Sequence, residues 1–206
     1  MSRIHLTPNS YHLLQDFVHK GHGETFEILR ELLDLQPAEA VVEVGCGTGL
    51  LASHFVMRGY DYWGIDLDPE RIAAAKALSP EGNFLTLNAL DIAHAPVPSL
   101  KKVYIHGMLH HVSETKCRQI IDSIMSLRPD PVLAVIEPFT PDPWWGNALG
   151  AFFAKMDAGK YIQTLAGWKR LFSPYLESYA IRSLWPRWPV QFIDARLVNR
   201  SPNKTG

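Results

Sequence analysis

The chain has 206 residues, of which 47% are hydrophobic and 20% charged, and its formal net charge is −1. This composition is typical of a globular domain and argues against a nucleic-acid partner, which usually requires a clustered basic surface. The two cysteines, Cys46 and Cys117, match no disulfide or zinc spacing. No apolar run reaches the roughly 18 residues of a spanning helix, so we expect a cytoplasmic protein.

Predicted helices and strands alternate along the first two thirds of the chain. Helices are expected at 10–20, 25–35, 47–59, 69–78 and 113–129, and a break is expected at 21–24. Short apolar strands are expected at 40–44, 60–66, 83–88, 101–107 and 131–139. Strands that are buried on both faces and alternate with helices indicate a parallel sheet covered by helices on both sides.

The end of the chain departs from this alternation. Residues 178–185 and 190–198 predict two strands joined by a PRWP turn, which makes a C-terminal hairpin. The predicted fold is therefore α/β, with a doubly wound, mostly parallel seven-stranded sheet that ends in an antiparallel hairpin. Neither repeats nor a linker divide the chain, so residues 1–206 are expected to form a single domain.

The stretch VVEVGCGTGLLA, residues 41–52, places a glycine-rich turn between the first strand and its helix. Such a turn lies at the carboxyl ends of the strands and lets a ligand approach the backbone closely. A dinucleotide fingerprint is GxGxxG, but here its third glycine position is Leu50. Glu43 would also oppose a pyrophosphate, whereas it suits a cationic ligand. A nicotinamide oxidoreductase is therefore disfavoured, although the glycines alone would also serve a tight turn.

Over residues 38–138 the chain resembles the class I S-adenosylmethionine-dependent methyltransferases, whose first motif is ExGxGxG. The resemblance implies a Rossmann-like fold and S-adenosyl-L-methionine as the cofactor. It implies cofactor contacts from the loop and from the residues that follow the next strands, namely Glu43, Gly45, Cys46, Gly47, Gly49, Asp66, Leu67, Asn88, Ala89 and His106.

Within this set the resemblance gives individual roles. Asp66 is expected to accept from both ribose hydroxyls, and Leu67 is expected to pack on the adenine. The family usually has Asp where this chain has Asn88, but an amide oxygen also accepts from the adenine amino group. The backbone N–H of Ala89 would reach the ring nitrogen, and the backbone of His106 would contact the methionine part.

The stretch HGMLHHV, residues 106–112, resembles the LHHV sequence of many family members and borders the predicted reaction centre. His110 and His111 are therefore the candidate catalytic bases, since histidine titrates near neutral pH. A structural role within the loop is the alternative for each. The N-terminal segment 1–36 is expected to form cap helices, with Tyr11 and His22 toward the substrate. Glu137 would either orient the substrate or cap a loop.

Segment 139–175 is aromatic and is the place where this family varies its substrate lid. Trp144, Trp145 and Tyr161 are expected to line an apolar substrate pocket. Two alternatives remain: a core role between helices and sheet, and a surface for peripheral membrane or lipid contact or for a homodimer.

The predicted function is methyl transfer (EC 2.1.1.-) from the cofactor to an apolar small molecule. O-methylation of an aromatic, quinone-like or lipid-like acceptor is the first choice, because a histidine base suits a hydroxyl or phenol. N- or C-methylation of a small metabolite is an alternative, and so is a catalytically silent partner subunit. The chain has no clear match to the Asp-Asp-Asn site of catechol-type enzymes, so no metal is predicted.

Overall fold

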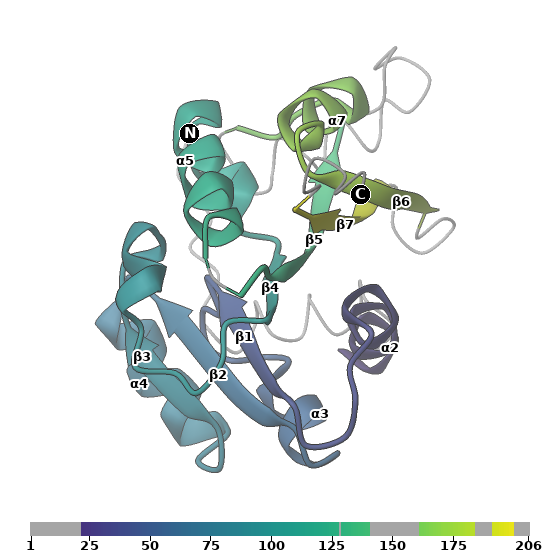
Figure 1. Cartoon of the computed structure of the whole chain (residues 1–206). Coiled ribbons are helices and arrows are strands. Elements are labelled where there is room, and N and C mark those ends of the chain that lie inside the picture. Colours follow the sequence, from purple (N-terminus) through teal and green to yellow (C-terminus); the bar gives the residue numbers. More distant parts are fainter. Residues whose placement is uncertain (1–21, 128, 141–160, 184–190, 200–206) are drawn as a thin grey trace, which may run out of the picture.

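The seven strands of the computed structural model form one sheet in the order β3-β2-β1-β4-β5-β7-β6, with helices on both faces (Figure 1). The structure describes residues 22–127, 129–140, 161–183 and 191–199. The strands are β1 (Ala40–Val44), β2 (Asp61–Asp66), β3 (Asn83–Thr86), β4 (Lys102–His106), β5 (Val132–Phe139), β6 (Leu176–Ser183) and β7 (Gln191–Val198). The α-helices are α2 (His22–Leu33), α3 (Ala52–Val56), α4 (Pro69–Leu78), α5 (Glu114–Met125) and α7 (Leu165–Phe172), with 3₁₀ turns η1 (Ala89–His94) and η2 (Leu109–His111).

Strand pairing confirms the predicted topology. Strands β1 to β5 pair in parallel, whereas β7 lies antiparallel between β5 and β6. The strand order reverses between β1 and β4, which is where a doubly wound sheet opens a crevice at the carboxyl ends of its strands. The glycine loop after β1 lies at this crevice.

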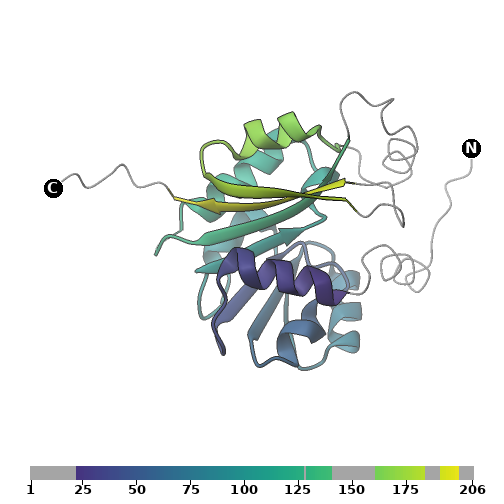
Figure 2. The same ribbon diagram turned by 90° about the vertical axis from the view of Figure 1, so that its right-hand side faces the viewer.

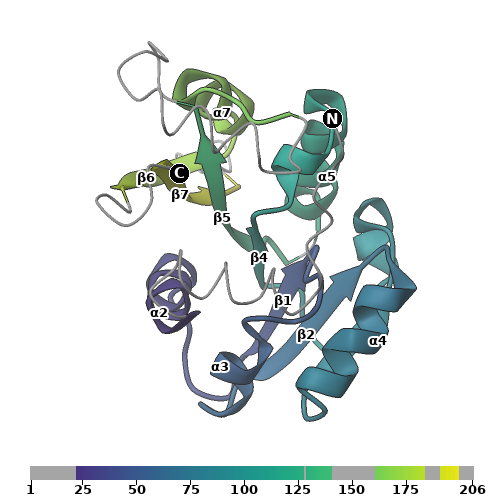
Figure 3. The same ribbon diagram turned by 180° about the vertical axis from the view of Figure 1, so that it is seen from behind.

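Two apolar clusters cover the two faces of the sheet. One joins the sheet to α2, α3 and α4, and includes the buried rings of Phe26 and Phe55. The other joins the sheet to η1, α5 and α7, and includes Trp168 and Phe172. The reverse view in Figure 3 shows the same separation of α2, α3 and α4 from α5 and α7. Alternate residues of each strand therefore pack against different helices.

Several predicted boundaries are wrong, and local chemistry explains them. The predicted helix 47–59 is helical only from Ala52 to Val56, because Gly47 and Gly49 have positive φ angles of 55° and 74°. Helix α2 begins at His22, so the predicted break at 21–24 is wrong: glycine costs less in a first turn, where backbone N–H groups need no helical partner. Strand β3 ends at Thr86 rather than residue 88, since the Asn88 side chain caps η1.

The predicted helix 10–20 lies outside the described residues, and the helix predicted at 113–129 ends at Met125. Of the predicted lid, the described part that starts at Tyr161 contains α7. Trp168 on α7 is fully buried in the core and its Nε1 donates to the Pro138 carbonyl at 2.9 Å. This part of the segment therefore has the core role.

Replacing Trp168 by alanine should lower the free energy of unfolding by about 3–5 kcal/mol, because it empties a large buried site and removes a hydrogen bond. Urea unfolding followed by circular dichroism measures this. Ile181→Ala is the matched control, since Ile181 is 50% exposed, and it should change stability by less than about 1 kcal/mol. Equal losses in the two variants would contradict the core role of Trp168.

Candidate cofactor and active site

The loop after β1 is shaped by glycines in left-handed conformations. Gly45 has φ +77°, and a Cβ added there would lie 2.4 Å from Met108 Cγ, so the turn after β4 packs directly against this loop. Gly47 has φ +55°, and a Cβ built on it would meet no atom of the described residues within 4 Å. Within the described part of the chain, the backbone at Gly47 therefore leaves room for the close approach of a ligand.

Asp66 at the end of β2 lies beside this loop. Its Oδ2 accepts from the Gly47 N–H at 2.9 Å, and its Oδ1 accepts from the Asp68 N–H at 2.9 Å. An ionised carboxylate has about four acceptor positions, so two backbone bonds leave capacity for further donors. Leu67, the next residue, is an apolar side chain that is 68% exposed. A carboxylate next to an exposed apolar surface fits a nucleoside, whose hydroxyls donate and whose base has flat apolar faces.

The segment after β3 adjoins the end of β2, because the Leu87 N–H donates to the Asp66 carbonyl at 2.9 Å. Asn88 is exposed, and its Oδ1 accepts from the Leu90 N–H at 3.1 Å. Its predicted contact with adenine therefore requires the second acceptor position of the same oxygen. Leu90, next to Ala89, is 38% exposed and is a further candidate site residue that the sequence analysis does not name. The signal that could have identified it is its position directly after Ala89.

Glu43 is buried under the loop rather than exposed to the crevice. It is 4% exposed, and its Oε2 accepts from the hydroxyls of Tyr62 on β2 and Tyr104 on β4, the latter at 2.8 Å. Burial raises the pKa of the Glu43 carboxyl to about 7, and the two tyrosine hydrogen bonds oppose that rise. The carboxylate thus links three neighbouring strands, and its predicted contact with a cationic ligand stays a prediction. Cys46, also buried, contacts this region.

Glu137 on β5 is completely buried and holds the turn after β4. Its Oε1 accepts from the backbone N–H groups of Met108 at 2.9 Å and Leu109 at 2.7 Å. Its Oε2 lies 2.7 Å from His110 Nδ1. Glu137 therefore caps η2 and orients a histidine, which is the capping role that the sequence left open. Its place in the substrate pocket stays a prediction.

His110 is 3% exposed, and its ring centroid lies 4.1 Å from that of the exposed His111. Because Glu137 already accepts three backbone hydrogen bonds, it acts as an acceptor toward His110, which places the proton of the neutral ring on Nδ1. Nε2 is then the nitrogen able to take up a proton. Of the two predicted bases, His110 is the one that the Glu137 carboxylate orients.

The remaining predicted residues are placed as follows. His106 ends β4 and is half-buried. The Tyr161 backbone N–H donates to the His110 carbonyl at 2.9 Å, and its side chain is 38% exposed, so this predicted pocket residue does lie near the histidine. His22 is buried at the start of α2, with its ring 6.0 Å from that of His54. Tyr11, Trp144 and Trp145 lie outside the described residues.

Two general searches cover only the described part of the chain. Within 22–127, 129–140, 161–183 and 191–199, no three His, Cys, Asp or Glu side chains are grouped so that they would hold a metal ion. Over the same ranges, every helix is too short or too polar to cross a bilayer.

Comparison with known proteins agrees with this geometry. Residues 41–129 match the family model described as a methyltransferase domain. The chain is 32% identical over 95 residues to the ubiquinone biosynthesis O-methyltransferase of Psychrobacter cryohalolentis, covering 46% of this chain but only 33% of that protein. The chain therefore spans about a third of the length of the curated relatives that it matches first.

Solved structures show the same fold. Human N-acetylserotonin methyltransferase, crystallised with S-adenosylmethionine, aligns with a TM-score of 0.66 and 18% identity over 91% of this chain and 55% of that one. Magnesium protoporphyrin IX methyltransferase from Synechocystis, with bound S-adenosylhomocysteine, aligns with a TM-score of 0.64 and 18% identity over 90% and 87%. Residues 41–129 thus match a methyltransferase domain, and the chain has the fold of solved S-adenosylmethionine-dependent methyltransferases.

The buried Glu43 carboxyl predicts a pH dependence of stability. Its pKa is raised on folding from 4.5 to about 7, so the folded state favours the protonated form. This contribution is present below about pH 4.5 and is lost as the pH rises through about 7, with a total of about 3 kcal/mol. Glu43→Gln keeps an acceptor oxygen for the tyrosines but does not titrate. Denaturant unfolding should therefore show that the advantage of the variant over wild type grows between roughly pH 5 and 8; parallel pH profiles would contradict the assignment.

Proposed function

We propose that the protein transfers a methyl group from S-adenosylmethionine to an oxygen atom of an apolar small molecule. When bound, this cofactor supplies a methyl group that its sulfonium already activates. The protein's own contribution is to hold the cofactor and the acceptor, and to remove a proton from the acceptor. The observation that carries the proposal is the buried Glu137–His110 pair beside the glycine loop.

Cofactor binding is assigned to the loop and to the ends of β2 and β3. The open backbone at Gly47, the half-buried Asp66 carboxylate and the exposed Leu67 side chain suit a nucleoside with free hydroxyls. Leu90, exposed on the neighbouring segment, offers a second apolar surface for the base. We assign Asn88 and Ala89 to the polar edge of the base, and His106 to the methionine end.

Proton removal is assigned to His110. A phenol or alcohol is a poor nucleophile until it loses its proton, and a histidine held by a carboxylate is a suitable base. Glu137 fixes the tautomer and would stabilise the imidazolium when Nε2 takes up the proton. Met108 connects this pair to the cofactor loop, because it contacts Gly45 and donates to Glu137. Base and cofactor loop are thereby held in one rigid arrangement.

Two observations of different kinds favour an oxygen atom as the methyl acceptor. An oriented base matters most for an oxygen nucleophile, whereas many amines and carbanions need less help. A curated relative is an O-methyltransferase of ubiquinone biosynthesis, which acts in a pathway that makes a quinone. N- or C-methylation remains the second candidate, together with a silent partner subunit. Transfer of labelled methyl groups to a panel of phenols, quinols, amines and lipids distinguishes them.

Replacing Asp66 by alanine should weaken S-adenosylhomocysteine binding by about 10- to 100-fold, because charge-assisted hydrogen bonds to the ribose contribute about 1.5–3 kcal/mol. Isothermal titration calorimetry measures the affinity. Asp91→Ala is the control, since Asp91 is an exposed carboxylate on η1, and it should bind as wild type does. Wild-type affinity in Asp66→Ala would remove the ribose assignment.

Replacing His110 by alanine should reduce turnover of a phenolic acceptor by about 10²- to 10⁴-fold while S-adenosylhomocysteine affinity is retained. Glu137→Gln should also reduce turnover, since an amide does not fix the same tautomer. His111→Ala should have a smaller effect, because Glu137 orients the ring of His110. If the His111 variant loses more turnover than the His110 variant, the base is His111 and the Glu137 pair is structural.

A further inference from the structure

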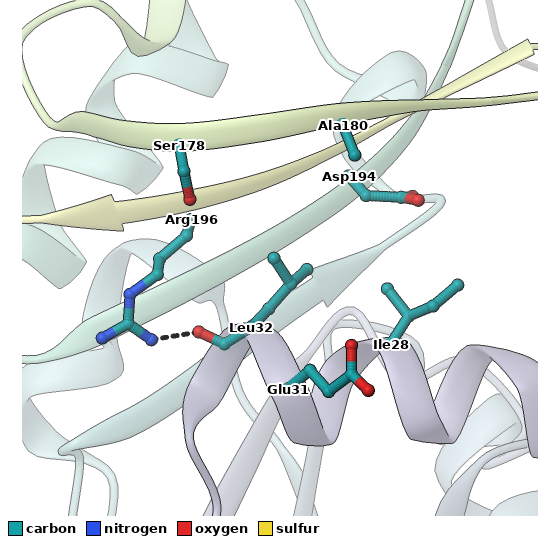
Figure 4. A pocket seen from close by; sticks show the side chains of 7 residues that line it. All are labelled: Ile28, Glu31, Leu32, Ser178, Ala180, Asp194 and Arg196. Atoms are coloured by element: carbon teal, nitrogen blue, oxygen red, sulfur yellow. Dashed lines mark hydrogen bonds between the residues drawn. The ribbon is translucent and has the colours of Figure 1, made fainter.

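A groove of about 290 Å³ lies between α2 and the outer strands β7 and β6 (Figure 4). Side chains of the helix and of the hairpin face each other across it. They are Ile28, Glu31, Leu32, Ser178, Ala180, Asp194 and Arg196. The groove lies on the α2 face of the sheet, so it is separate from Glu137, whose strand neighbours Val135 and Phe139 belong to the opposite core.

The groove exists because small side chains face a helix that does not extend over the last strand. Helix α2 contacts β4, β5 and β7, and Figure 2 shows it lying along the sheet. On β6, the residues toward the groove are Ser178 and Ala180, which leave space. Ile28 and Leu32, one helical turn apart on α2, form an apolar wall opposite them. This part of the groove fits an apolar chain or ring.

One end of the groove is fixed by α2. Arg196 donates through Nη1 to the Leu32 carbonyl, near the carboxyl end of the helix. Strand β7 runs antiparallel to β5, so Asp194 lies nearer than Arg196 to the sheet edge where β5 and β6 end. The groove therefore extends from Arg196 toward the edge that carries the cofactor loop.

Asp194, which lines the groove, binds the guanidinium of Arg182 behind it, and this guanidinium has an unused donor. Arg182 binds Asp194 through Nε–Oδ2 at 3.1 Å and Nη2–Oδ1 at 3.2 Å, and its guanidinium lies 5.3 Å from the Phe192 ring centroid. Arg182 Nη1 is buried and has no hydrogen-bond partner in the described structure. A buried donor without an acceptor is costly, so this atom marks a place for an oxygen.

A second buried polar group without a partner lies on α2, on the helix face that carries Ile28 and Leu32. Thr25 is completely buried, and its hydroxyl has no partner among the described residues. It precedes Ile28 by three residues and Leu32 by seven, so the three side chains share one helix face. Like Arg182, Thr25 lies toward the edge where the strands end. Two polar atoms thus lack partners at the same end of the molecule.

The charged side chains around the groove favour an uncharged oxygen group of the ligand over a carboxylate or an ammonium. Asp194 already neutralises Arg182, and Glu177 pairs with Arg196. A ligand carboxylate would add a negative charge beside Asp194 and Glu31, while an ammonium would face Arg182 and leave its donors unused. We propose that the groove binds the apolar body of an uncharged molecule whose carbonyl oxygen accepts from Arg182 Nη1.

The identification of this molecule as the methyl acceptor rests on the proposed function. Three strand spacings separate β4, which precedes the His110 turn, from β6, so the acceptor would have to span at least about 14 Å and also reach from one face of the sheet to the other. The acceptor class is then an elongated ketone, ester or quinone-type molecule with a methylatable hydroxyl at one end and an apolar remainder. Binding in the groove does not itself depend on methyl transfer.

The test uses Nile red, an uncharged apolar dye with one carbonyl oxygen, titrated into the full chain and followed by fluorescence. Ala180→Trp fills the groove and should weaken dye binding at least about tenfold. Ile181→Trp changes the neighbouring residue on the exposed opposite face of β6 and should bind the dye as wild type does. Equal affinity in the two variants would overturn the proposal. S-adenosylhomocysteine calorimetry confirms that both variants are folded.

Competition tests the chemistry of the ligand. 2-Nonanone should displace the dye from wild type at least about tenfold more effectively than nonanoate or nonylamine, and Arg182→Lys should remove most of this preference because lysine lacks the planar set of donors. Stronger displacement by either charged compound would overturn the carbonyl assignment. If Ala180→Trp does not fold, the loss of preference in Arg182→Lys decides alone. Groove binding without any methyl transfer would contradict only the proposed function.

Discussion

The buried carboxylate of Glu137 is the interaction on which the candidate active site depends. It lies near the end of a strand whose other residues are apolar, and it accepts from three backbone N–H groups at the start of η2 as well as lying 2.7 Å from His110 Nδ1. A buried carboxylate is stable only when such donors surround it. The turn after β4 therefore has one favourable conformation, and that conformation places Met108 against Gly45. The cofactor loop and the histidine are positioned by the same charge.

Glu43 plays a comparable part on the other face of the sheet. Its tyrosine partners come from the strands on either side of β1, so the carboxylate holds together the three strands beneath the glycine loop. Here the donors are neutral hydroxyls rather than backbone amides at a helix start, and burial dominates, which is why the carboxyl pKa rises to about 7. The acid of the first motif thus has an architectural role in this chain that its position in the motif does not reveal.

Much of the fold could be predicted from the sequence because the signals are local. Short branched runs such as Ala40–Val44 and the acidic cap before Pro69 depend on neighbouring residues only. Asp66 could be placed because it ends a strand beside the glycine loop. The partners of Glu137 could not, since Met108 and His110 are 29 and 27 residues away and meet it only after β4 and β5 pair. The start of α2 is hard to predict for a local reason, since two glycines are typical of a break, whereas Gly23 belongs to the first turn of the helix.

The alternation of residues along β5 explains how one strand serves two different surfaces. Val135 and Glu137 face α5 and the histidine turn, whereas Ile136 faces α2 and is paired in register with Asp194 on β7. The polar residues on the two faces, Glu137 and Asp194, lie near the same edge of the sheet, since β5 ends at Phe139. A molecule that bridges the groove and the histidine must therefore cross this edge rather than pass through the sheet. If the groove holds the methyl acceptor as proposed, the acceptor is long and bends over the strand ends, with its apolar part on the α2 face and its reacting atom on the other.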